Sequence, residues 1–165
     1  MTLHETVEQI YEAEREHLYA YLLYFGVRPQ RAQELVQDSF LKLYRRMEKG
    51  EVIESPKAWL YRVAHNLALR DFTREPRFDE LAPDLAAGED TRGSDVEQGA
   101  IDAQRKAALI QAVRGLSPQQ RNCLHLRAQG LRYREIAEVV GISTSAVGEF
   151  LRRATVRLKE VLDGY

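Results

Sequence analysis

An acidic strip with several turn-forming residues divides this chain into two blocks of helical pattern. Residues 78–103 hold eight acidic side chains and one arginine, and Pro83, Gly88, Gly93 and Gly99 lie among them. Because no apolar period continues through most of the strip and its charges repel one another, we predict a flexible linker. The flanking blocks differ in charge: residues 1–77 carry 12 basic and 12 acidic side chains, whereas residues 104–165 carry 11 and 5. The pattern therefore predicts two domains, 1–77 and 104–165, joined by the linker 78–103.

Both blocks repeat apolar residues at spacings of three and four, and neither shows a strand signal. Helices are predicted from about residue 3 to Gly26, from Pro29 to Gly50, and from Pro56 to Pro76. In the second block they are predicted over 96–113, 119–129, 133–140 and from Ser143 to about residue 162. The helix after Pro56 is expected to bury Trp59, Leu60, Val63, Ala64, Leu67 and Phe72. The fold class is therefore all-α, with two small helical domains.

The sequence argues against several kinds of protein. Its longest apolar stretch, about residues 19–27, is too short to span a bilayer, and the first residues do not form a secretory signal. We expect no membrane insertion and a cytoplasmic location. The single cysteine, Cys123, cannot form an internal disulfide, and the four histidines do not fall at zinc-ligand spacing. No glycine-rich phosphate loop is present, so we expect no metal, no cofactor, no catalytic residue and no enzyme activity.

Residues 133–159 have the pattern of a helix-turn-helix, in which the start of the second helix enters the major groove of DNA. A short helix, YREIAEVV, precedes the turn Gly141-Ile142-Ser143, and a second helix with several arginines follows. Ile136, Ala137 and Val140 are expected to pack against Val147 and Leu151. The outward face would then carry Thr144, Ser145, Gly148, Glu149 and Arg152. The alternative is a plain helical hairpin with a solvated basic face.

The helix after Pro56 carries a second polar cluster with interleaved aromatic rings. It consists of Trp59, Tyr61, Arg62, His65, Asn66 and Arg70. Rings can stack on unstacked bases while polar groups contact base edges and phosphates. Composition alone favours the alternative, a core tryptophan beside a solvated polar face.

The order of these segments resembles that of the extracytoplasmic-function (ECF) sigma factors of bacteria. The stretches are AQELVQDSFLKLYRRM, then SPKAWLYRVAHNLALRDFTRE, then, after the acidic strip, LSPQQRNCLHLRAQGLRYREIAEVVGISTSAVGEFLRRATVRLKE. The resemblance implies two helical domains that bind core RNA polymerase and direct it to promoter DNA. It also implies an anti-sigma factor as a partner.

The resemblance assigns roles to particular residues. Binding to the clamp of the polymerase falls to Glu34, Gln37, Asp38 and Leu41. Opening of the minus-ten element falls to the loop 49–55 and to Lys57, Trp59, Tyr61, Arg62, His65, Asn66 and Arg70. Contact with the minus-thirty-five element falls to Ser143, Thr144, Ser145, Gly148, Glu149, Arg152 and Arg153.

The start of the last helix departs from the family pattern. Gly148, Glu149 and Phe150 stand where the family usually has a lysine, a small residue and an arginine. Glu149 could accept a hydrogen bond from a cytosine amino group or simply repel phosphate, and Phe150 could join the core or touch a thymine methyl. This departure motivates one alternative, a sigma-like decoy that captures an anti-sigma factor. A stand-alone helix-turn-helix regulator also stays open, although such a protein would need a sensor or dimer domain in the first block and would gain nothing from Trp59, Asn66 and Arg70 on one helix.

Overall fold

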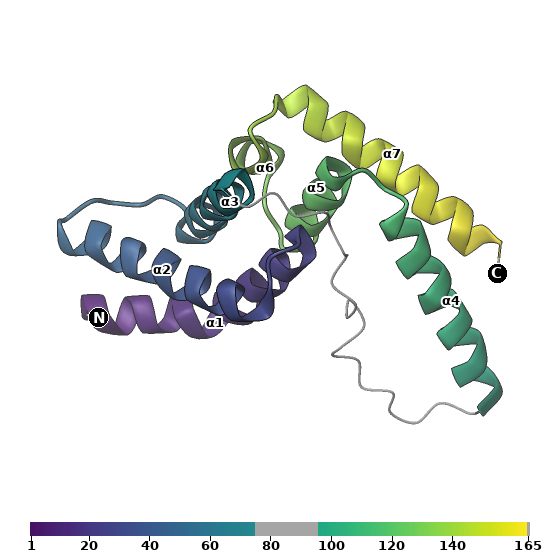
Figure 1. The fold of residues 1–165 in the computed structure, drawn as a ribbon, viewed down its shortest axis with the longest axis horizontal. Helices are drawn as coiled ribbons and strands as arrows, with labels where there is room; N and C mark the ends of the chain where they lie inside the picture. Colours follow the sequence, from purple (N-terminus) through teal and green to yellow (C-terminus); the bar gives the residue numbers. More distant parts are fainter. Residues whose placement is uncertain (75–95, 165) are drawn as a thin grey trace.

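The computed structural model of the chain describes residues 1–74 and 96–164, and these ranges hold seven α-helices and no strand (Figure 1). In chain order they are α1 (Leu3–Phe25), α2 (Pro29–Glu48), α3 (Pro56–Arg74), α4 (Val96–Arg114), α5 (Pro118–Ala128), α6 (Tyr133–Val140) and α7 (Thr144–Asp163). The all-α prediction is confirmed. The predicted flexibility of residues 78–95 lies outside the described residues. From Val96 onward the predicted linker is already helical, as the apolar pattern indicated.

Helices α1, α2 and α3 form the N-terminal lobe, residues 1–74. The Thr2 hydroxyl accepts a hydrogen bond from the Glu5 amide at 3.2 Å, and the Glu5 carboxylate accepts one from the Thr2 amide at 3.0 Å. This capping box fixes the start of α1. Gly26 ends α1 in the left-handed conformation, with φ 107°, which a residue with a side chain rarely adopts. The reversal lets α1 and α2 pack side by side and bury Leu18, Leu22 and Leu35.

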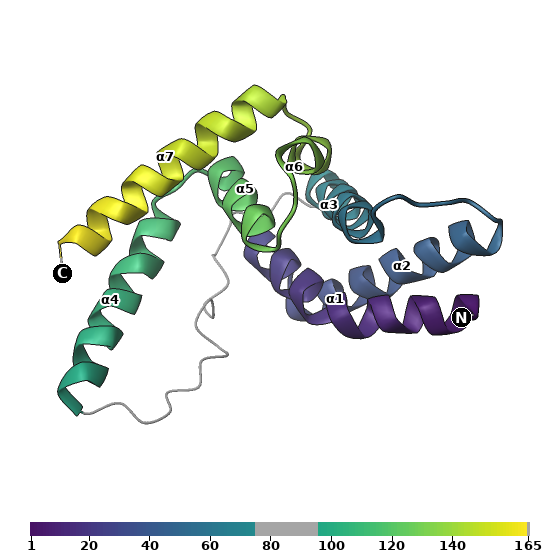
Figure 2. The same cartoon turned by 180° about the vertical axis from the view of Figure 1, so that it is seen from behind.

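Helices α4 to α7 form the C-terminal lobe, residues 96–164. The hydroxyl of Ser117 accepts the Gln120 amide at 3.2 Å, and that of Ser143 accepts the Ala146 amide at 3.1 Å. These two bonds mark the starts of α5 and α7 where the sequence predicted them. Gly141, at φ 78°, forms the tight turn between α6 and α7, so the helix-turn-helix is confirmed. The C-terminal end of α4 contacts α7, and the two helices diverge from there in both views (Figures 1 and 2).

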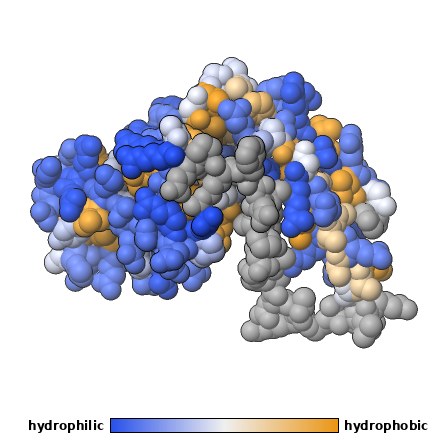
Figure 3. All heavy atoms as spheres, in the orientation of Figure 1, coloured by the Kyte–Doolittle hydropathy of each residue, from blue (hydrophilic) through white to orange (hydrophobic). Residues whose placement is uncertain are grey.

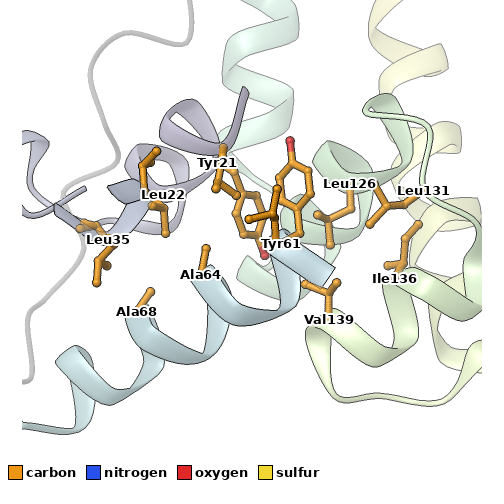
Figure 4. Packing of buried hydrophobic residues seen from close by; sticks show 14 of the residues in the cluster. Tyr21, Leu22, Leu35, Tyr61, Ala64, Ala68, Leu126, Leu131, Ile136 and Val139 are labelled. Atoms are coloured by element: carbon orange, nitrogen blue, oxygen red, sulfur yellow. The ribbon is translucent and has the colours of Figure 1, made fainter. Parts of the chain in front are cut away.

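The two lobes pack directly against each other. Helix α6 lies on α3, and α5 contacts the last part of α1. Figure 4 shows Tyr61 of α3 beside Leu126 of α5, with Val139 of α6 close to the start of α3. These residues belong to one continuous buried cluster that crosses from lobe to lobe. The apolar interior is therefore shared between the lobes, which positions the helix-turn-helix relative to α3.

Candidate nucleic-acid interface

The polar residues predicted on α3 divide into an exposed group and a buried group. Arg62, Asn66 and Arg70 are exposed, and their spacing of four residues places them in one row along the helix. Trp59 is half-buried at the start of this row. Lys57 is half-buried, and its Nζ lies 3.5 Å from the Glu14 carboxylate. The structure therefore brings Trp59, Arg62, Asn66 and Arg70 to one accessible edge of α3.

Tyr61 and His65 belong to the core instead. Their relative exposures are 1% and 3%, so an accessible position for these two side chains is wrong. The predicted buried face of α3 is also shifted, because Leu60 and Ala64 are buried as expected but Ala68 is buried too. The remaining residues expected inside are only half-buried: Trp59, Val63, Leu67 and Phe72. The reason is that α3 is covered by α1 and α2 and, in addition, by α6, whereas periodicity within one block assumes a single covered face.

A cluster of tyrosines and histidines lies where α1 and α3 approach α5. The Tyr21 Oη and the His65 Nδ1 share a hydrogen bond of 2.7 Å. The His125 ring of α5 has its centroid 5.3 Å from those of both Tyr21 and Tyr24. Burial lowers the pKa of His65 to about 4, and burial together with the charge of His17 does the same for His125. Both imidazoles are therefore neutral near pH 7.

A cavity of about 580 Å³ opens between the loop before α3, the start of α3 and α6. Trp59 and Arg62 line it from α3, and Arg132, Arg134 and Glu138 line it from the opposite side. Arg132 and Arg134 were not among the residues predicted from the sequence. Their only signal is their place at the start of the helix-turn-helix, because nothing in the sequence indicates that α6 faces α3. The cavity thus combines an aromatic ring with cations from both lobes.

The start of α7 presents a small polar surface. Thr144 and Ser145 are exposed, Gly148 is half-buried, and Ser143 is engaged as the helix cap. Phe150 is half-buried and packs against the core, so of its two predicted roles it takes the structural one.

The buried face of α6 differs in one residue from the prediction. Val139 is buried together with Ile136 and Ala137 because it faces α3, whereas Val140 is only half-buried.

Glu149 holds both arginines that follow it on α7. Its Oε1 accepts hydrogen bonds from Arg152 Nη2 at 2.8 Å and from Arg153 Nε at 2.9 Å, and its Oε2 accepts one from Arg152 Nε at 3.2 Å. These bonds to two guanidinium groups lower the pKa of Glu149 to about 2. Glu149 is therefore ionised at any ordinary pH, and both of its oxygens are occupied. Direct readout of cytosine by Glu149 would require these bonds to rearrange.

The predicted polymerase-binding residues lie together on the outer face of α2. Glu34, Gln37, Asp38 and Leu41 are all exposed. The leucine is 48% exposed, which suits a contact with a partner protein. Arg31 bridges this surface to α3, since it donates to Glu34 at 2.8 Å and to Asp71 at 2.7 Å. Figure 3 shows that the visible face of the N-terminal lobe is largely hydrophilic with scattered apolar residues.

No site for a metal or a membrane span is found among residues 1–74 and 96–164. No group of three or more histidine, cysteine, aspartate or glutamate side chains there could hold a metal ion. No helix in these ranges has the length and apolar character needed to cross a bilayer. Cys123 is buried as a free thiol.

Comparison with known proteins identifies the family. Residues 10–78 match the model of sigma-70 region 2, and residues 106–158 match that of sigma-70 region 4. The chain is 30% identical to the ECF RNA polymerase sigma factor BldN of Streptomyces coelicolor, over 93% of this chain and 59% of that protein. It is 28% identical to the RNA polymerase sigma factor YlaC of Bacillus subtilis, over 94% and 91%.

A solved structure shares the fold of both lobes. It is the sigma factor RpoE of Bartonella quintana in complex with the anti-sigma factor NepR, with a TM-score of 0.65 at 25% identity over 94% of this chain and 96% of that one. The first matched region covers most of α1 and all of α2 and α3, and the second runs from the second half of α4 into α7. The chain therefore belongs to the ECF sigma factors, which are non-enzymatic initiation factors of bacterial RNA polymerase.

Proposed function

We propose that this sigma factor contacts the minus-ten element through α3 and the minus-thirty-five element through the start of α7 when it is bound to core polymerase. The observation that carries the proposal is the presence of two separate surfaces suited to DNA on one chain. One has exposed Arg62, Asn66 and Arg70 beside a half-buried tryptophan, and the other is a capped helix-turn-helix. The first suits unstacked bases and the second suits duplex DNA.

The minus-ten surface includes the loop that precedes α3. Val52 at this loop is 97% exposed, and an apolar side chain in that position can contact an unstacked base. Trp59 and Asn66 complete the surface with a ring for stacking and an amide for a base edge. Tyr61 and His65 are not included, because they pack against Tyr21 inside the N-terminal lobe.

Run-off transcription with purified core polymerase and a genomic fragment library tests this function. The wild-type chain should produce discrete start sites, and Asn66→Ala should reduce transcripts from those promoters about fivefold or more, since a good side-chain contact to a base edge contributes about 1–3 kcal/mol. Gln9→Ala, an exposed amide truncated on α1, is the matched control. Discrete start sites that are equally strong with Asn66→Ala would refute the role of this face.

We also propose that Glu34, Gln37, Asp38 and Leu41 form the polymerase-binding surface. Leu41→Asp should abolish co-elution with core polymerase, because it introduces a charge into an apolar contact. Leu162→Asp, on an exposed leucine of α7, is the control. Equal binding by the two variants would refute this surface. A wild-type chain that binds polymerase without supporting any transcript would favour the decoy interpretation.

The location and the remaining partner follow from the same function. A protein that acts with RNA polymerase on promoter DNA works in the cytoplasm of a bacterium, so we propose that location for this chain. The complex of RpoE with NepR supports an anti-sigma factor as a partner of this chain as well. Co-purification of tagged chain from its own cells, followed by mass spectrometry, tests both proposals.

A further inference from the structure

The Glu149 carboxylate occupies one particular edge of the Arg152 guanidinium. It accepts from Arg152 Nε and Nη2, which together form the side edge of that group. Arginine has five N–H donors in a fixed plane. Holding the side edge leaves the terminal edge, made by Nη1 and Nη2, with its own pair of parallel donors. The carboxylate thereby fixes the plane of the guanidinium and does not cover its terminal edge.

Among the described residues no hydrogen bond is seen at this terminal edge, and its geometry suits one base. Two parallel donors match the O6 and N7 acceptors of guanine in the major groove, the commonest specific contact made by arginine. Arg152 remains reachable, because 63% of its side chain is exposed. It lies on the face of α7 that begins with the exposed Thr144 and Ser145. An arginine held in one orientation loses less rotamer entropy on binding than a free one.

The same carboxylate reduces the attraction of α7 for phosphate. Arg152 and Arg153 both donate to Glu149, so these three residues together carry a net charge of +1 instead of +2. Non-specific DNA affinity depends mainly on how many phosphates the cations neutralise. Glu149 therefore weakens binding to any sequence while leaving the hydrogen-bonding edge of Arg152 available.

Gly148 leaves room beside this arginine. It stands one helical turn before Arg152, and a Cβ built on it would have a single close neighbour among the described residues, Tyr133 Cε2 at 3.8 Å. A side chain at 148 would project from the helix next to the path of a base edge. Its absence lets the edge of the duplex approach the helix near Arg152.

From this arrangement we propose that Glu149 is a positioning and specificity-determining residue, which presents the terminal edge of Arg152 to a guanine in the upstream promoter element. The proposal rests on the proposed role of α7 as the reader of that element. It explains the departure at 148–149 from the family pattern: a cation directed at phosphate is exchanged for an arginine oriented toward a base.

Selection of promoters by the reconstituted holoenzyme tests the proposal. Core polymerase with the full chain is incubated with a promoter library whose upstream element is randomised, and bound sequences are counted. The wild-type chain should require guanine at one position, by about 5-fold to 150-fold over other bases. Arg152→Lys should lose that preference although it keeps the charge, because lysine lacks the planar fork.

Glu149→Gln supplies the decisive comparison. It should weaken the preference at that same position by about threefold or more. It should also make the logarithm of affinity fall more steeply with the logarithm of salt concentration, by about one unit of slope, as one cation is released to phosphate. Glu160→Gln, an exposed acid about three turns further along α7, should change neither quantity.

Each remaining outcome overturns the proposal in a recognisable way. A preference that changes only at a cytosine position in Glu149→Gln would show that Glu149 reads a base directly. An affinity that rises equally for every sequence would show that Glu149 is only a repulsive charge. Unchanged selection by both Glu149→Gln and Arg152→Lys, with initiation at discrete sites retained, would show that α7 uses other residues. If the wild-type holoenzyme selected no upstream sequence at all, the role of α7 itself would fail.

Discussion

Val139 provides a direct way to separate the two lobes without damaging either one. It lies on α6, is 2% exposed, and is buried on the side of α6 that faces α3. Ile136 and Ala137, the other buried residues of α6, are left intact by a change at Val139. The substitution Val139→Asp is therefore expected to open the contact between α3 and α6 while the helix-turn-helix stays folded.

The expected magnitude follows from burial. Removing a fully buried valine side chain costs about 1.5–3 kcal/mol, and a carboxylate in its place adds the cost of desolvating a charge. At 1.4 kcal/mol per factor of ten, the ratio of closed to open molecules should fall at least about tenfold. Trp59, the only tryptophan of the chain, lines the cavity between the lobes. Its emission should shift to longer wavelength and its quenching by acrylamide should increase.

The assay needs a control for the substitution itself. Val156→Asp places the same change on an exposed valine of α7 and should leave the Trp59 emission unchanged. Circular dichroism should show equal helix content in both variants, and small-angle scattering should show a larger radius of gyration for Val139→Asp alone. A folded Val139→Asp variant with the emission and dimensions of the wild-type chain would refute the argument that this contact holds the lobes together.

Three further predictions concern stability, and urea unfolding measures each. Burial holds the folded-state pKa of His65 and His125 near 4, below the unfolded value of about 6.5, so the unfolded chain binds more protons between these two pH values. The free energy of unfolding should therefore fall as the pH drops from about 6.5 to 4. His125→Phe should make this pH dependence shallower, and an unchanged slope would contradict the argument. Tyr21→Phe should cost about 1–3 kcal/mol, because it leaves the buried His65 Nδ1 without its 2.7 Å partner. Gly141→Ala should lower the free energy of unfolding by about 1–2 kcal/mol, because alanine is strained at φ 78° even though a Cβ there has no described neighbour within 4 Å. Gly148→Ala inside α7 should raise the free energy of unfolding by up to about 1 kcal/mol, because alanine favours a helix more than glycine does. Equal effects of the two substitutions would refute the conformational argument.

Local signals in the sequence were sufficient for the helices and their ends. Ser117 and Ser143 form the caps that their positions predicted, and Gly26 and Gly141 adopt the left-handed conformation at helix ends. These features depend on a few neighbouring residues and on backbone chemistry. The order of the two lobes and the place of the helix-turn-helix followed from the same signals.

The contact between the lobes could not be predicted in the same way. Tyr61 and His65 are buried partly because the second lobe closes over the N-terminal one, and no periodicity within residues 1–77 reports on a partner beyond the linker. The ion pairs of Glu149 did have a signal, because Arg152 and Arg153 follow at spacings of three and four. The predicted roles of Glu149 concerned DNA alone and did not include its arginine partners on the same helix.

The half-buried ring of His125 bears on how readily the lobes separate. Its Nε2 is buried with no hydrogen-bond partner in the described part of the chain, although the ring lies between two tyrosines of the other lobe. A buried polar atom without a hydrogen bond raises the free energy of the state in which the lobes are in contact. Parting the lobes would rehydrate that nitrogen and offset some of the loss of apolar contact. The contact between the lobes is therefore apolar and extensive, but one of its polar atoms is left without a partner among the described residues.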